Sequence, residues 1–139
     1  MRRTLGDGFE LDDDRSRVDL DAVHAFISGE SYWGRGRPRE IVRGAVEGSL
    51  RVVGLYRGAE QVGFARVVSD RATFAYLADV YVLHAHRGRG LGVELVREAV
   101  DTEPWSTFRW HLGTSDAHAL YEKFGFGSPS GRMMQRDPS

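Results

Sequence analysis

The sequence predicts one α/β domain (α+β in the order of its elements), in which helices flank a mixed, mostly antiparallel sheet. Valine-rich segments with a period of two occupy the middle of the chain, and segments with a helical period lie on both sides of them. Of the 139 residues, 41% are apolar and 28% are charged, which is typical of a globular protein. We therefore expect residues 1–139 to form a single domain with a packed core.

The N-terminal third predicts two helices. Residues 1–17 contain glycines and an acidic run, and we expect a loose entry with one short polar edge strand there. A helix is expected up to Gly29 with Asp19 as its N-cap, because apolar residues then recur at helical spacing. "SYWGRGRP" predicts a loop with exposed aromatic side chains, and Pro38 suits the first turn of a second helix.

After Gly48 the period becomes that of strands. "LRVVGLYRGAEQVGFARVVSD" predicts a β-hairpin with its turn at residues 57–60. The run from Thr73 to Leu83 is apolar on both faces, which predicts a central strand. A helix from Leu91 that ends before Pro104 is expected next, followed by a strand in "FRWHLG", a helix in "DAHALYEKF" and a last strand in "GRMMQ".

The composition excludes several classes of function. The chain has no cysteine, so disulfides, thiolate nucleophiles and cysteine metal sites are excluded, and the five histidines have no metal-ligand spacing. A net charge of −1 gives no general attraction to nucleic acid. No apolar run approaches the roughly 20 residues of a membrane span, and the N-terminus does not read as a signal peptide. We expect a cytoplasmic protein without a metal, a nucleic-acid partner or a membrane partner.

The segment "HAHRGRGLG" lies between the expected central strand and the helix that follows. Its glycines leave several backbone N–H groups open at a helix N-terminus, and Arg87 and Arg89 can add charge-assisted hydrogen bonds. The segment matches neither the P-loop pattern nor GxGxxG, because Leu91, Gly92 and Val93 stand at the required positions. It predicts an anion site, with a plain glycine-rich surface turn as the alternative.

Two motifs resemble signatures of the GNAT superfamily of N-acetyltransferases. "VYVLHAHRGRGLGVELVREAV" is similar to its acetyl-CoA-binding motif, with Arg87, Gly90 and Gly92 at the fixed positions of R/Q-x-x-G-x-G/A. "HLGTSDAHALYEKFGF" is similar to its second signature, and the resemblance covers about residues 31–134. It implies a GNAT-like sheet that is splayed between the fourth and fifth strands, acetyl-CoA as the donor, and a possible homodimer through the last strand.

The resemblance also implies how the donor is held. Backbone N–H groups from Arg87 to Gly92 would bind the CoA pyrophosphate, and the end of the central strand would pair with the pantetheine. An N–H near Val82 would polarise the thioester carbonyl. Thr114 stands where the family often has asparagine, and Thr114 or Ser115 is the substitute for that hydrogen bond. The implied cofactor-binding residues are Val80, Val82, Arg87, Gly88, Arg89, Gly90, Leu91, Gly92 and Thr114.

Two residues are candidates for proton transfer. Tyr121 occupies the family's tyrosine position, and the resemblance makes it the acid that protonates the CoA thiolate; core packing is the alternative. Asp79 lies inside the most apolar strand, and a buried carboxylate without a cationic partner is a stronger base than an exposed one. Its alternatives are a structural aspartate that meets Arg66 and a water-relayed route in which it only attracts a cationic substrate.

Aromatic side chains are candidates for the acceptor pocket. Tyr32 and Trp33 lie in a polar loop, where exposed rings are costly without a use; core packing is again the alternative. Tyr56, Phe74 and Tyr76 could extend an aromatic wall or fill the faces of the sheet. The expected function is acetyl-CoA-dependent N-acetylation of a primary amine on a small molecule. Direct transfer in a ternary complex is expected, since no cysteine can carry the acetyl group. A non-catalytic acyl-CoA-binding or sensing module is the alternative.

Overall fold

The computed structural model describes residues 1–139 and contains one six-stranded sheet in the order β1-β2-β3-β4-β5-β6. All neighbouring strands are antiparallel except β5 and β6, which are parallel. The predicted mixed, mostly antiparallel sheet is therefore confirmed. The strands are β1 (Arg2–Thr4), β2 (Phe9–Asp12), β3 (Arg51–Arg57), β4 (Glu60–Ser69), β5 (Phe74–Val82) and β6 (Arg109–His111); the helices are α1 (Leu20–Gly29), α2 (Arg39–Gly48), α3 (Leu91–Val100) and α4 (His118–Glu122).

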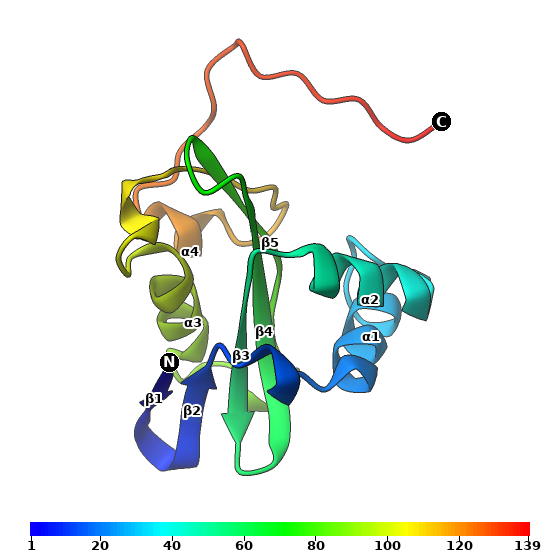
Figure 1. Cartoon of the computed structure of the whole chain (residues 1–139), viewed down its shortest axis with the longest axis vertical. Helices are drawn as coiled ribbons and strands as arrows, with labels where there is room; N and C mark the ends of the chain where they lie inside the picture. The colour runs from blue at the N-terminus through cyan, green and yellow to red at the C-terminus, as the bar shows by residue number, and fades with distance from the viewer.

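Helices cover both faces of the sheet. In Figure 1, α1 and α2 lie on one side of the strands, and α3 and α4 lie on the other. Each side has its own apolar cluster: Leu95 and Val96 of α3 pack with one face of the sheet, and Phe26 and Ile27 of α1 pack with the other. Burial of these two helical stripes holds the three layers together.

The sheet splays where β5 and β6 diverge. The two strands pair only from Phe74 to Tyr76, while β5 continues to Val82. A β-bulge lies in the unpaired part, since the pairing to β4 shifts between Phe64 and Arg66, and Asp79 has a φ of 53°. The bulge turns β5 away, and it leaves one backbone edge of this strand without a partner strand. The predicted splay between the fourth and fifth expected strands is confirmed; an additional N-terminal strand makes these β5 and β6.

Three predictions about strands need correction. The N-terminal segment forms a hairpin of two strands instead of one edge strand, with Asp7 and Gly8 at positive φ in its turn. The predicted strand "GRMMQ" is wrong, because residues 127–139 contain no strand and Met134 is 94% exposed, with no apolar face to pack against. The strand predicted from Thr73 to Leu83 was expected to be buried on both faces. The first half of β5 is buried on one face only, since Phe74 and Tyr76 are exposed.

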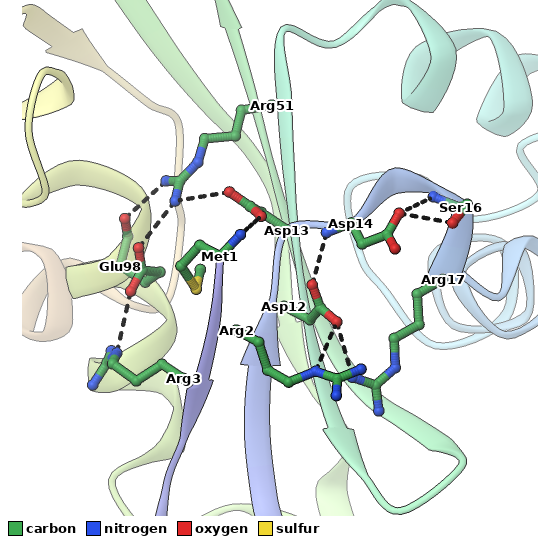
Figure 2. A network of polar contacts seen from close by, with 10 residues as sticks. All are labelled: Met1, Arg2, Arg3, Asp12, Asp13, Asp14, Ser16, Arg17, Arg51 and Glu98. Carbon is green, nitrogen blue, oxygen red and sulfur yellow. Dashed lines mark hydrogen bonds and ion pairs between the residues drawn. The ribbon is translucent and has the colours of Figure 1, made fainter.

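A buried ion network fixes α3 against the sheet (Figure 2). Glu98 of α3 is 4% exposed, and its carboxylate accepts hydrogen bonds from Arg51 of β3 at 3.0 Å and from Arg3 of β1 at 3.2 Å. Arg51 also donates to the main-chain carbonyl of Glu98 at 2.8 Å. Because α3 begins directly after the glycine loop, this network also sets the position of that loop.

Candidate active site

The glycine loop presents free backbone donors to open space. Gly88 and Gly90 have φ values of 80° and 77°, a left-handed conformation that favours glycine, and Gly90 is the N-cap of α3 without a side-chain cap. The N–H groups of Gly88, Arg89 and Gly90 donate to no acceptor in the chain. A Cβ atom at Gly88, Gly90 or Gly92 would meet nothing within 4 Å. The loop can therefore hold an anion at the N-terminus of α3, as a phosphate site requires.

The two arginines of this loop have partners inside the chain. Arg87 donates from its main-chain N–H to His84 at 3.2 Å and from Nε to the carbonyl of Val82 at 2.9 Å. These bonds close the loop onto the end of β5. The guanidinium of Arg89 lies 5.8 Å from the ring centroid of Phe9, beside the N-terminal hairpin. The free N–H groups therefore begin at Gly88, one residue later than expected.

A cavity of about 280 Å³ occupies the splay between β5 and β6. It receives side chains from β5, from the loop between α1 and α2, and from the segment that leads from β6 into α4. Its polar and aromatic lining consists of Tyr32, Trp33, Arg37, Arg66, Tyr76, Asp79, Thr114, Asp116 and Tyr121. The fold thus brings Tyr121, Asp79, Val80, Thr114, Tyr32 and Trp33 of the predicted site together around one cavity.

Tyr121 both packs in the core and lines the cavity. Its side chain is 8% exposed, belongs to the apolar cluster under α3, and makes an edge contact with Phe126 at 5.9 Å between centroids. Burial, with smaller contributions from the nearby Tyr32 and Asp116, raises the pKa of the Tyr121 phenol to about 12. The phenol is therefore a neutral proton donor throughout the physiological pH range.

Asp79 is held by three donors. Its carboxylate accepts hydrogen bonds from Arg66 Nε at 2.7 Å and from Trp33 Nε1 at 2.8 Å, and Arg37 Nη1 lies 3.4 Å from both oxygens. The base role predicted for Asp79 depended on a carboxylate without a cation, and that premise is wrong. The structure agrees with the alternative of an aspartate that meets Arg66. Asp79 organises one wall of the cavity, and its lone pairs are already used.

The loop that carries Tyr32 and Trp33 is internally braced. Ser31 Oγ donates to the Ile27 carbonyl at 2.7 Å and accepts from the N–H of Gly34 at 3.0 Å. Tyr32 Oη accepts from the N–H of Ser115 at 2.8 Å, which lowers the pKa of this phenol and ties the loop to the segment before α4. The rings of Tyr32 and Trp33 contact edge to face at 5.1 Å. The aromatic wall is therefore held in place by contacts within the chain.

The structure also shows what the sequence did not reveal. Of the three rings expected to extend the aromatic wall, only Tyr76, at the last paired position of β5, lines the cavity. Phe74 lies in the paired part of β5 opposite Arg109, and Tyr56 is buried in the core. Val82 is not in the cavity wall either. Arg37 and Asp116 were missed. Their signals were weak: Arg37 shares the "GRGRP" loop with a second arginine, Arg35, and Asp116 lies between the two residues that the second motif marks, Thr114 and Tyr121.

Comparisons with known proteins agree with this geometry. The family model described as "Acetyltransferase (GNAT) domain" matches residues 48–127, which is more than half of the chain. The crystal structure of a Xanthomonas campestris pv. campestris protein assigned to the GNAT acetyltransferases is 40% identical, covers 94% of this chain and 93% of its own, and has a TM-score of 0.87. A candidate acetyltransferase of Gibberella zeae is 29% identical over 88% of this chain and 80% of its own.

More distant structures share the fold alone. Glucosamine-6-phosphate N-acetyltransferase from Arabidopsis thaliana is 15% identical, with a TM-score of 0.62 over 92% of this chain and 97% of its own. No helix is long and apolar enough to cross a membrane. The glycine loop, the splayed sheet, the family model and the close structural likeness lead to one conclusion: the chain belongs to the GNAT family of acetyltransferases.

Proposed function

We propose that this protein is an acetyl-CoA-dependent N-acetyltransferase that transfers the acetyl group directly to a primary amine of a small molecule in a ternary complex. Family membership implies an acyl-CoA donor. One observation carries the proposal: β5, whose edge beyond Tyr76 is not paired with β6, lines the same cavity as Tyr121 and leads along the chain into the glycine loop with its free N–H groups.

The residues present fit such a donor. The N–H groups of Gly88, Arg89 and Gly90 would hold its pyrophosphate in the open space before α3, and the free edge of β5 offers main-chain groups to its pantetheine. Bound acetyl-CoA would supply the thioester. Thr114 lies in the same cavity wall, but its Oγ1 accepts from the N–H of Ala117 at 3.1 Å, and it therefore shapes the turn before α4.

The proton balance assigns a role to Tyr121. The amine nitrogen bonds to the thioester carbon, the C–S bond breaks, and the thiolate takes the proton of the Tyr121 phenol. The amine loses one proton to water, and the phenolate recovers one from water. We favour this water-relayed route because Asp79 is engaged by its three donors. The acceptor amine must be neutral at the moment when it attacks.

Two measurements test the proposal together. We expect acetyl-CoA and CoA to raise the heat-denaturation midpoint, since a ligand that binds only the folded state stabilises it. We further expect CoA thiol to appear from acetyl-CoA when a suitable amine is added. If neither CoA species shifts the midpoint, the donor assignment is wrong. A shift without thiol release from any amine in a broad panel would instead favour a sensing module.

A further inference from the structure

We propose that the acceptor amine carries an anionic group and that Arg37 binds it, an inference that rests on the proposed transferase function. The cavity wall contains two guanidinium groups, Arg37 and Arg66, and a single buried carboxylate, Asp79, whose side chain is 7% exposed. One carboxylate cannot neutralise two cations. The second carboxylate of the lining, Asp116, belongs to the segment before α4 and pairs with neither arginine. An excess positive charge therefore lies on the side of the aromatic wall.

Asp79 is shared unequally between the two arginines. Arg66 makes the short contact at 2.7 Å and also lies 3.4 Å from Ser49 Oγ, whereas Arg37 reaches both Asp79 oxygens only at 3.4 Å. The guanidinium of Arg37 makes no other hydrogen bond, and its side chain is 24% exposed. Arg37 therefore keeps donors in the planar arrangement that pairs with a carboxylate or phosphate.

The main chain of Arg37 is held in place. Its N–H donates to the Gly34 carbonyl at 2.9 Å, and His24 Nε2 lies 3.1 Å from its carbonyl oxygen. Gly34 is required beneath it, because a Cβ there would lie 2.5 Å from Ile27 and 3.2 Å from the Arg37 guanidinium carbon. A charged side chain on such a fixed main chain loses little freedom when it binds a ligand.

The direction of approach assigns the anion to the acceptor. Arg37 reaches the cavity from the loop between α1 and α2, while the free N–H groups of the glycine loop precede α3, on the other face of the sheet (Figure 1). The phosphates of a donor at the glycine loop are thus served by different groups. Arg37 is placed to bind the anionic group of an acceptor that enters the cavity beside the aromatic wall.

A second charge at the cavity supports a zwitterionic acceptor. Asp116 is exposed, and no cation or hydrogen-bond donor engages its carboxylate; only its N–H is used, toward Thr114 at 3.4 Å. It lies on the α4 side of the cavity, and Arg37 lies on the α1–α2 side. An ammonium drawn toward Asp116 and an anion bound by Arg37 suit an amino acid or a similar small molecule. The volume of about 280 Å³ suits an acceptor of that size.

Matched acceptor pairs test this inference with acetyl-CoA as donor. Thiol release is measured with glycine, leucine and phenylalanine against their amides, and with phosphoethanolamine against ethanolamine. We expect the wild-type protein to favour an anionic member by at least about tenfold in kcat/KM, which corresponds to roughly 1.4 kcal/mol. The amides have the more readily deprotonated amine, so a preference for the acid cannot come from amine reactivity. Equal rates within every pair would overturn the inference.

Two variants localise the effect. Arg37→Gln should bring the acid-to-amide ratio close to one, mainly through a higher KM for the acid, and Arg37→Lys should restore part of the ratio. Arg35→Gln is the matched control, because Arg35 is an exposed arginine in the same loop that does not line the cavity. A ratio that Arg37→Gln leaves unchanged in a folded protein would contradict the role of Arg37. If Arg37→Gln does not fold, the wild-type ratios decide alone.

Further measurements distinguish failure of this inference from failure of the proposed transferase function. Succinyl-CoA is compared with acetyl-CoA, since an anionic acyl group could also meet Arg37. A preference for succinyl-CoA that Arg37→Gln abolishes would move the anion to the donor and overturn the inference. If neutral amines react as well as acids, this inference fails and the transferase function stands. If acetyl-CoA binds but no amine releases thiol, the transferase function fails, and the inference fails with it.

Discussion

At the scale of single residues, Tyr121 combines two properties that usually exclude each other. It is packed among apolar side chains, and it still borders the cavity in the splay. Packing fixes the ring, and burial raises the pKa of the phenol to about 12. A fixed, neutral phenol can deliver a proton to a leaving thiolate without first having to be protonated itself.

Replacing Tyr121 with phenylalanine tests this role. Tyr121→Phe keeps the ring and its packing, so we expect acetyl-CoA affinity and the heat-denaturation midpoint to stay close to wild type. We expect kcat to fall about 100-fold, the loss typical of one general acid. Stopped-flow thiol detection measures kcat, calorimetric titration measures the acetyl-CoA affinity, and a heat-denaturation scan measures the midpoint. Unchanged turnover would leave Tyr121 as a packing residue.

The pH dependence of turnover follows from the same pKa. The acceptor must lose a proton before it attacks, so kcat/KM should rise with pH up to the pKa of the acceptor amine. The raised pKa keeps the Tyr121 phenol protonated, and a falling limb is expected only as the pH approaches 12. Rates measured from pH 6 to pH 10.5 check this. A fall of activity between pH 7 and pH 9 in a folded protein would contradict the assignment.

At the scale of elements, the loop between β5 and α3 forms the proposed donor site. Gly90 has a left-handed backbone, and a side chain there would enter the space in front of the free N–H groups. We therefore expect Gly90→Val to reduce acetyl-CoA affinity by at least about 100-fold, through blocked access to the N–H groups and through a strained backbone that costs about 1–2 kcal/mol.

Gly58→Val is the matched control for the backbone strain. Gly58 lies in the β3–β4 turn with a φ of 59°, and a Cβ there also meets nothing within 4 Å. Both variants should lose similar stability in urea denaturation, but only Gly90→Val should lose donor binding. Normal binding by a folded Gly90→Val protein would remove this loop from the site.

Element types followed from sequence periodicity, whereas the details of the site did not. The helices before Gly29 and Gly48, the hairpin turn at residues 57–60 and the start of α3 lie where the sequence predicted them. The pairing of Asp79 could not be predicted in full, because its partner Arg37 lies 42 residues away in a loop. The strand expected in "GRMMQ" failed because a short apolar stretch alone does not provide a surface to pack against.

At the scale of the whole molecule, the ion network around Glu98 joins three elements. It ties β1 and β3 to α3, and removal of Glu98 would leave the buried Arg51 guanidinium with only the longer, 3.6 Å contact to Asp13. We expect Glu98→Ala to lower the free energy of unfolding by about 3 kcal/mol. Glu47→Ala, on the exposed face of α2, is the control and should change it by less than about 0.5 kcal/mol.

Urea denaturation followed by circular dichroism measures both variants. Salt gives a second readout, because buried ion pairs are screened much less than exposed ones. The stability difference between wild type and Glu98→Ala should therefore persist in 0.5 M salt. A Glu98→Ala protein as stable as the Glu47→Ala control would show that α3 is held by apolar packing alone.

The family and its fold follow from two motifs in the right order, but the acceptor depends on contacts between distant segments. The cavity is assembled from β5, the α1–α2 loop and the segment before α4, which no single stretch of sequence reveals. Tyr32 and Trp33 were predictable because exposed rings in a polar loop are unusual. Arg37 became visible only through its weak, shared contact with Asp79.

The most direct test of the proposed transfer is mass-spectrometric detection of the acetylated amine. Purified protein is incubated with acetyl-CoA and a panel of small amines, with Gly90→Val and Tyr121→Phe in parallel. We predict an N-acetylated product and an equal amount of free CoA with wild-type protein. Gly90→Val should form almost none, and Tyr121→Phe about one hundredth of the wild-type rate. Thiol release without any acetylated amine, or product formation at the wild-type rate by Gly90→Val, would contradict the assignment of this site.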